Sequence, residues 1–177
     1  MNYHKIEKTS IVNGTGIRVV LWVSGCSLHC KGCHNPETWN VRSGKLFDEE
    51  AKRELFEALD KPYIQGITFS GGHPLESENV ETIYLLIKEI KENFPTKDIW
   101  LYTGYTLEQI FPTIVTNNFD INRFYRQAIV EMCDVVVDGK YIEELKDITL
   151  QWKGSSNQRV VDIKSSIEQE KVVLWEQ

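Results

Sequence analysis

The chain has 177 residues, of which 41% are hydrophobic and 26% charged, and its formal net charge is −6 at pH 7. This length suits a single domain, residues 1–177, and is too short for two ordinary domains. No apolar run could span a bilayer and no block of Lys and Arg would attract a nucleic acid, so neither a membrane nor a nucleic acid is predicted as a partner. Because no secretory signal is recognisable, a cytoplasmic protein is expected.

Predicted strands and helices alternate along the chain. Residues 1–10 have no clear pattern, whereas the first apolar run is nearly continuous and suits a strand buried on both faces. Asp48 can cap the first helix, and Pro112 interrupts the third. In chain order we expect a strand at 17–23, helices at 48–59 and 79–94 separated by a strand at 67–69, a strand at 99–102, a short helix from Thr106, a helix at 121–132, and strands at 133–137 and 159–163.

Three further expectations concern single residues and the last segment of the chain. Within the helix at 121–132, the spacing predicts that Ile121 and Ile129 face the core. Val172 to Trp175 either add a last strand or dock on the sheet. Arg18, at the start of the first strand, either points to a carboxylate or is solvated, and we favour the solvated position.

Cys26, Cys30 and Cys33 lie in a loop directly after the first strand, in a C-x3-C-x2-C spacing. Three thiolates can converge there on one centre, and the small residues Gly25 and Gly32 let the backbone fold round an inorganic cluster. Three cysteine ligands leave one iron of a four-iron cube without a protein sulfur. The sequence therefore predicts a [4Fe-4S] cluster with an open iron, at which a substrate could bind.

Two other uses of these cysteines are less favoured. A structural zinc site needs four ligands and would have to recruit His29, His34 or Cys133, and this cysteine spacing is unusual for zinc. Three cysteines within eight residues cannot all pair with one another as disulfides, and nothing directs the chain to an oxidising compartment. A zinc-binding structural module therefore stays an alternative, and Cys133 is expected in the core.

The alternation of strands and helices favours parallel pairing with right-handed crossovers. About five parallel strands cannot close an eight-stranded barrel, so we predict an α/β fold built as an open partial (βα) barrel. In such sheets, the loops at the carboxyl ends of the strands form the active face. Four candidate motifs fall there: the cysteine loop, Gly71-Gly72-His73-Pro74, Thr103-Gly104-Tyr105 and Asp138-Gly139-Lys140.

The cysteine triad, followed by His34-Asn35 and Thr38-Trp39, resembles the radical S-adenosylmethionine superfamily, and within it the activases that install glycyl radicals. The resemblance implies that the three cysteines hold a [4Fe-4S] cluster and that the amino and carboxylate groups of S-adenosylmethionine bind the fourth iron. Many members carry an aromatic residue directly before the third cysteine, near the adenine. This chain has Gly32 there, so His34 or a backbone contact would serve instead.

The resemblance also implies S-adenosylmethionine contacts on the other loops. Residues 71–74 match a Gly-Gly-acid-Pro stretch that lines the methionine amino group, with His73 in place of the acid. A neutral imidazole can accept one hydrogen bond but lacks the negative charge of a carboxylate. Thr103 resembles a strand-end hydroxyl residue, and Asp138 and Lys140 match an Asp-x-Lys near the polar end of the ligand. The expected contacts are Gly32, Cys33, His34, Gly71, Gly72, His73, Thr103, Asp138 and Lys140.

A closer resemblance appears when the motifs are taken together. Ser-Gly-Gly, Trp-Leu-Tyr-Thr-Gly-Tyr, Val-Asp-Gly-Lys and Gly-Ser-Ser-Asn-Gln-Arg follow the cysteines in this order over nearly the whole chain. This order is similar to that of the activating proteins of anaerobic (class III) ribonucleoside-triphosphate reductases. The last motif, Gly154 to Arg159, distinguishes them from pyruvate formate-lyase activases.

The implied function is that of an oxidoreductase that activates its partner. With one electron from an external donor, it would cleave S-adenosylmethionine reductively and generate the glycyl radical on the glycyl-radical subunit of the reductase. Such chemistry belongs to the cofactor and requires no acid–base pair or nucleophile beyond the cluster ligands. A pyruvate formate-lyase-type activase, or a small synthase of the deazapurine type, is the alternative within the superfamily.

Overall fold

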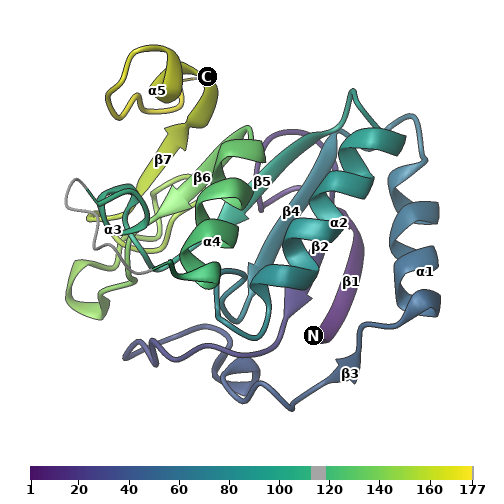
Figure 1. Ribbon diagram of the computed structural model, residues 1–177. Coiled ribbons are helices and arrows are strands. Elements are labelled where there is room, and N and C mark those ends of the chain that lie inside the picture. Colours follow the sequence, from purple (N-terminus) through teal and green to yellow (C-terminus); the bar gives the residue numbers. More distant parts are fainter. Residues whose placement is uncertain (113–118, 177) are drawn as a thin grey trace.

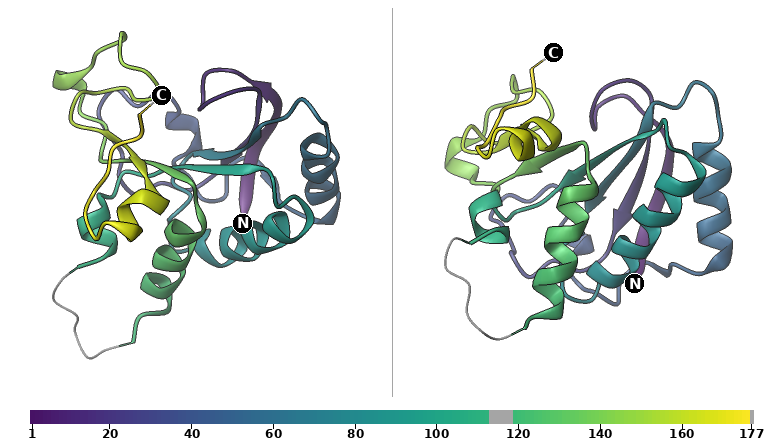
Figure 2. Two further views of the ribbon diagram at one scale, coloured as in Figure 1. Left: turned by 90° about the horizontal axis from the view of Figure 1, so that it is seen from above. Right: turned by 45° about the horizontal axis from the view of Figure 1, so that its top comes forward.

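The computed structural model describes residues 1–112 and 119–176. Its strands form one seven-stranded sheet in the order β3-β1-β2-β4-β5-β6-β7. Figures 1 and 2 show α1, α2 and α4 over one face of this sheet. The strands are β1 (Asn2–Ser10), β2 (Arg18–Val23), β3 (Lys45–Leu46), β4 (Gly66–Gly71), β5 (Asp98–Tyr102), β6 (Val135–Asp138) and β7 (Arg159–Asp162).

The middle of the sheet is parallel and its edges are antiparallel. Strands β2, β4, β5 and β6 pair in parallel, as the alternation of strands and helices predicts. Strands β1 and β7 run antiparallel to their neighbours, so the sheet has four parallel strands and not about five. The antiparallel direction of β7 follows from the connection between β6 and β7. It contains only the 3-10 turn η2 (Glu143–Leu145) and no crossover helix, and antiparallel pairing needs none.

Strand β1, like the short strand β3, is not predicted by the sequence. It pairs with β2 on one side and only with the two-residue β3 on the other. Seven of its nine residues are only partly buried or are exposed, in no simple alternation, because one side of the strand is nearly an edge. A strand in this position needs no apolar stripe, and therefore its sequence carries little signal.

The helices that the sequence predicts begin and end close to the expected positions, whereas α5 at 163–168 is not predicted. The Asp48 side chain accepts a hydrogen bond from the Ala51 N–H and so caps the first helix, and Thr106 and Gln109 form a capping box on the third. Ile121 is 45% exposed, contrary to expectation, because the buried residues of its helix lie in the second half. The helices are α1 (Glu49–Leu59), α2 (Val80–Asn93), α3 (Leu107–Ile110), α4 (Ile121–Met132), α5 (Ile163–Glu168) and the 3-10 turn η1 (Pro36–Thr38).

Apolar clusters cover both faces of the central strands. The larger cluster packs the helices on the sheet and includes Cys133, as predicted. The smaller one contains Trp100, which packs edge-to-face against Trp152 and Trp175. The backbone N–H of Trp175 donates to the Val160 carbonyl at 2.9 Å, so the C-terminal segment docks on β7. No helix in the described residues is long and apolar enough to cross a membrane.

Arg18 is fully buried, and the expectation of a solvated side chain is wrong. It opens a central strand, so its guanidinium reaches across β4 to β5 and pairs with the carboxylate of Asp98. It also donates to the Thr68 hydroxyl at 2.9 Å and to the Ile67 carbonyl at 2.8 Å, and it lies over the Trp100 ring. Such a buried charge is tolerated only because its donors find partners.

Candidate metal centre

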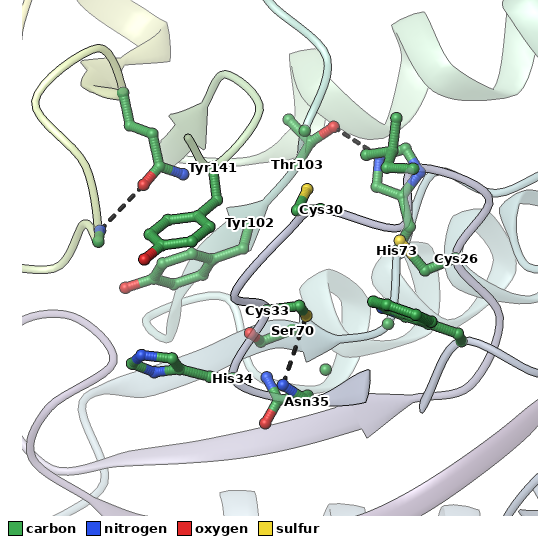
Figure 3. A pocket seen from close by; sticks show the side chains of 17 residues that line it. Cys26, Cys30, Cys33, His34, Asn35, Ser70, His73, Tyr102, Thr103 and Tyr141 are labelled. Atoms are coloured by element: carbon green, nitrogen blue, oxygen red, sulfur yellow. Dashed lines mark hydrogen bonds between the residues drawn. The ribbon is translucent and has the colours of Figure 1, made fainter. Parts of the chain in front are cut away.

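The loops that follow the parallel strands surround one cavity of about 200 Å³. Its lining comes from the cysteine loop after β2, the Gly-Gly loop after β4, the end of β5, and the connection from β6 to β7. Figure 3 shows labelled side chains from all four segments facing this space. The volume exceeds what one metal ion needs, so a larger group can occupy the cavity.

Cys26, Cys30 and Cys33 all line the cavity, and they are free, partly exposed thiols. Figure 3 shows their three sulfur atoms round the same space. In the part of the chain that the structure describes, no group of three or more Cys, His, Asp or Glu residues is arranged to hold a single metal ion. Thiols spaced round a cavity of this size fit a four-iron cluster better than one zinc ion.

Backbone hydrogen bonds hold the cysteine loop in shape. The Gly25 N–H donates to the Thr38 carbonyl at 2.7 Å, and the Cys26 N–H donates to the Trp39 carbonyl at 3.0 Å. The turn η1 therefore closes the loop behind the cysteines. Near its other end, the Asn35 N–H donates to the sulfur of Cys33 at 3.4 Å. This contact places a hydrogen-bond donor on a predicted cluster ligand.

Gly32 has a backbone role and does not line the cavity. Its φ of 72° lies in the left-handed region, and a Cβ atom there would meet the Glu143 carboxylate at 1.8 Å. The left-handed backbone at this position therefore favours glycine over an aromatic residue before the third cysteine. His34 lines the cavity, whereas the expected contact between Gly32 and S-adenosylmethionine stays a prediction.

The thiols of Cys26 and Cys30 lie in a setting that opposes ionisation. Burial raises the pKa of the Cys26 thiol, and the backbone N–H groups of Leu28 and His29 partly oppose this effect. Burial also raises the pKa of Cys30, while the positive charge of Lys140 opposes the rise. Lys140 is exposed and does not line the cavity, but its charge acts on a predicted cluster ligand. Metal binding would release protons from such thiols.

The Gly-Gly loop is tied directly to the cysteine loop. The Gly72 N–H donates to the Val23 carbonyl at 2.8 Å, and the His73 N–H donates to the Gly25 carbonyl at 2.7 Å. A Cβ atom on Gly72 would lie 2.6 Å from the Gly25 carbonyl oxygen, which is backbone and cannot move aside cheaply. The glycine is therefore required for the two loops to approach each other.

His73 is 1% exposed and lines the cavity. Its Nε2 forms a hydrogen bond of 2.8 Å with the Thr103 hydroxyl, shown as a dashed line in Figure 3. Its Nδ1 has no hydrogen-bond partner within the described ranges but lies 3.7 Å from Oε2 of Glu76. The carboxylate of Glu76 therefore lies next to His73, the residue that replaces the acid of the family's Gly-Gly-acid-Pro stretch.

Asp138 is buried, but it does not line the cavity. Both of its carboxylate oxygens face the guanidinium of Arg159, and Oδ2 also accepts from the Leu107 N–H at 2.9 Å. A buried carboxylate needs such partners, and once they are in place it is not available to a ligand in the cavity. Asp138 therefore has a structural role at the end of β6, and its expected contact with S-adenosylmethionine stays a prediction.

The motif from Gly154 to Arg159 fastens the turn that follows β6. Gln158 accepts from the Gly154 N–H at 2.9 Å and donates to the Gly139 carbonyl at 3.0 Å. Asn157 donates to the Lys140 carbonyl at 2.8 Å. Gln158 also lines the cavity, a role that sequence reasoning missed. The polar motif that contains Gln158 is visible in the sequence, but the position of Gln158 at the cavity depends on the antiparallel pairing of β7 with β6. Other missed lining residues are Trp39, Tyr102 and Tyr141.

Fold and site together define an α/β iron–sulfur protein with one cluster. In agreement, the family model described as "4Fe-4S single cluster domain" matches residues 12–161. This match confirms the predicted [4Fe-4S] cofactor and disfavours the zinc module.

Curated relatives narrow the family further. Three of them are anaerobic ribonucleoside-triphosphate reductase-activating proteins. The one from Enterobacteria phage T4 is 44% identical over 90% of this chain and 93% of the phage protein. The one from Escherichia coli strain K12 is 41% identical over 90% of this chain and 97% of its own length. The one from Haemophilus influenzae is 39% identical over 89% of this chain and 96% of its own length. The chain belongs to this family of activating proteins, which confirms the resemblance found in its motifs.

Proposed function

We propose that this chain generates the glycyl radical of an anaerobic ribonucleoside-triphosphate reductase. The observation that carries the proposal is the convergence of Cys26, Cys30 and Cys33 on one cavity, against a Gly-Gly loop joined to them by backbone hydrogen bonds. Cys26, Cys30 and Cys33 would hold the cluster, which, once reduced by an external donor, would supply the electron for reductive cleavage of S-adenosylmethionine and so the radical chemistry that removes a hydrogen atom from a glycine of the partner. The chain's own residues bind and orient these groups.

Six of the nine expected S-adenosylmethionine contacts line the cavity, and we retain these as the proposed contacts. They are Cys33, His34, Gly71, Gly72, His73 and Thr103. Backbone carbonyls beside the two glycines can accept hydrogen bonds from the amino group of the ligand, because no side chain keeps it away. His34 belongs to the same loop as the cysteines, which suits a contact with the adenine. Lys140, near Cys30, would attract the ligand's carboxylate without lining the cavity.

His73 and Glu76 are proposed to act together in place of the family's acid. The imidazole of His73 is the largest cause that lowers the pKa of Glu76 to about 2; burial opposes it, and the hydrogen bonds from Ser27 add to it. Glu76 therefore keeps its negative charge close to His73. Glu76 thus supplies the negative charge that a carboxylate at position 73 would supply, but from one side chain further from the cavity.

Finer features of the fold, the location and the partners complete the proposal. The open sheet would be the partial (βα) barrel typical of radical S-adenosylmethionine enzymes, with residues 1–177 acting as one domain. The protein would work in the cytoplasm, where thiols stay reduced. An external one-electron donor would reduce the cluster, and the glycyl-radical subunit of the reductase would approach the cavity from the side of the loops.

The experiment that tests the function uses the anaerobically reconstituted protein. We expect the electron paramagnetic resonance signal of the reduced cluster to change when S-adenosylmethionine is added, and a glycyl-radical signal to appear when the reductase subunit is also present. Cys26→Ala should abolish both signals, and Cys133→Ala, in the core, should retain them.

Two results would contradict the proposal. A cluster signal that ignores S-adenosylmethionine would remove the proposed chemistry. A radical formed on pyruvate formate-lyase but not on the reductase, or turnover of a small molecule without any protein partner, would reassign the substrate within the superfamily.

A further inference from the structure

Two indole N–H groups, those of Trp39 and Trp175, are buried and have no hydrogen-bond partner in the described part of the protein. A buried donor without a partner destabilises the folded state, so such a group calls for an explanation. The two tryptophans differ in one respect. Trp39 lines the cavity with the three cysteines, whereas Trp175 packs on Trp100 away from it.

The position of Trp39 is fixed by the cysteine loop itself. Its carbonyl accepts the hydrogen bond from the Cys26 N–H at 3.0 Å, so its backbone is coupled to the first predicted cluster ligand. Its ring packs against the imidazole of His29, with centroids 4.6 Å apart and planes inclined by 31°. His29 belongs to the same loop, between Cys26 and Cys30. The indole is therefore held from two sides at the wall of the cavity.

We propose that the indole N–H of Trp39 donates a hydrogen bond to a sulfur atom of the [4Fe-4S] cluster. This inference rests on the proposed function, since it requires the cluster on Cys26, Cys30 and Cys33. Sulfur atoms of the cluster carry negative charge and accept N–H donors, and the loop already directs one N–H, that of Asn35, at the sulfur of Cys33. Occupancy of the cavity by the cluster would supply the partner that the buried indole lacks.

The expected consequence is a change in the reduction potential of the cluster. Reduction adds negative charge to the sulfur atoms, so a hydrogen bond to them is stronger in the reduced state and raises the potential. Trp39 would therefore tune the reduction potential of the cluster, and it touches no substrate in this proposal. Its effect should be visible before S-adenosylmethionine is present.

The test is a redox titration of the reconstituted protein without S-adenosylmethionine. Trp39→Phe removes the N–H and keeps an aromatic ring against His29, and we expect a shift of the midpoint potential to more negative values with the iron content unchanged. The matched control is Trp175→Phe, which removes the other unpartnered N–H and should leave the potential as in the wild type. An unchanged potential in Trp39→Phe, with a full cluster, would overturn the proposal.

A second measurement keeps the proposal testable if Trp39→Phe fails to load a cluster. Protein labelled with ¹⁵N in the indole nitrogen of tryptophan should show a ¹⁵N hyperfine coupling to the reduced cluster by pulsed electron paramagnetic resonance, and Trp175→Phe should retain it. No coupling, or one that appears only with S-adenosylmethionine, would overturn the proposal. Either failure can occur while S-adenosylmethionine is still cleaved, so it is distinguishable from failure of the proposed function.

Discussion

Glu76 binds Ser27, the residue directly after Cys26, which is the first predicted cluster ligand. Its carboxylate accepts hydrogen bonds from the Ser27 N–H at 2.8 Å and from the Ser27 hydroxyl at 3.2 Å. Since Glu76 also lies beside His73, a single carboxylate connects the cysteine loop with the Gly-Gly loop. The two loops that form the cavity are therefore coupled by charge as well as by backbone hydrogen bonds.

Glu76→Gln should destabilise the protein and alter its response to acid. The pKa of Glu76 is lowered to about 2, chiefly by His73. A carboxyl group with a lowered pKa in the folded state contributes stability above its unfolded pKa of about 4.3, and this contribution is lost as the pH falls towards about 2. The amide should cost about 1–2 kcal/mol near neutral pH and should remove this part of the acid sensitivity.

Urea denaturation of both proteins between about pH 7 and pH 3 measures this difference. The exposed Glu50→Gln, whose partner Arg53 is 3.9 Å away, serves as the control and should leave the curve unchanged. Parallel curves for wild type and Glu76→Gln across this pH range would show that Glu76 has no such role.

Gly72→Ala should separate the two loops, whereas Gly104→Ala should be tolerated. The new Cβ atom of Gly72→Ala would collide with the Gly25 carbonyl oxygen, which is part of the cysteine loop. The Cβ atom of Gly104→Ala would meet the tip of the Leu28 side chain at 2.1 Å, and a flexible side chain can move aside. We expect a loss of about 1–3 kcal/mol and reduced iron loading for Gly72→Ala only.

Iron content after reconstitution, together with the urea midpoint, tests this contrast. Both glycines line the cavity, so general crowding of the site would impair the two variants equally. Equal loss of iron in both would refute the specific role of the contact between Gly72 and Gly25.

Arg18→Met should be strongly destabilising. The side chain of Arg18 is fully buried, and its loss would leave the carboxylate of Asp98, 24% exposed, without its partner. Breaking a buried pair in this way costs about 3–5 kcal/mol. Lys8→Met provides the comparison, because Lys8 and its partner Glu54 are 58% and 43% exposed and the pair should contribute little to stability. Similar urea midpoints for the two variants would contradict this account.

Arg159→Met should leave Asp138 as an unpaired buried carboxylate. The Asp138 side chain is 1% exposed and Arg159 is its charged partner, so a loss of about 3 kcal/mol is expected. Adding Asp138→Asn removes the buried charge, and the double variant should recover part of the loss. A double-mutant cycle from urea denaturation gives the coupling energy, and strictly additive effects would show that the pair is not coupled.

Local patterns were enough to predict much of this protein. The cap at Asp48, the apolar spacing of α2 and the interruption at Pro112 depend on residues within a few positions of one another. The three cysteines likewise lie within one loop, and their spacing indicated an iron–sulfur centre that the family match confirms. Such features depend on short-range geometry, which the order of residues determines directly.

Tertiary structure decided which side chains face one another across the sheet. Arg18 meets Asp98 from two strands away, and Arg159 meets Asp138 only because β7 turns back antiparallel to β6. These pairings determine that Asp138 is engaged outside the cavity and that Gln158 lines it. The sequence alone predicted the three cluster ligands and indicated the class of protein, because both predictions rest on local spacing. Partners that are distant in the sequence required the fold, because burial and register bring them together.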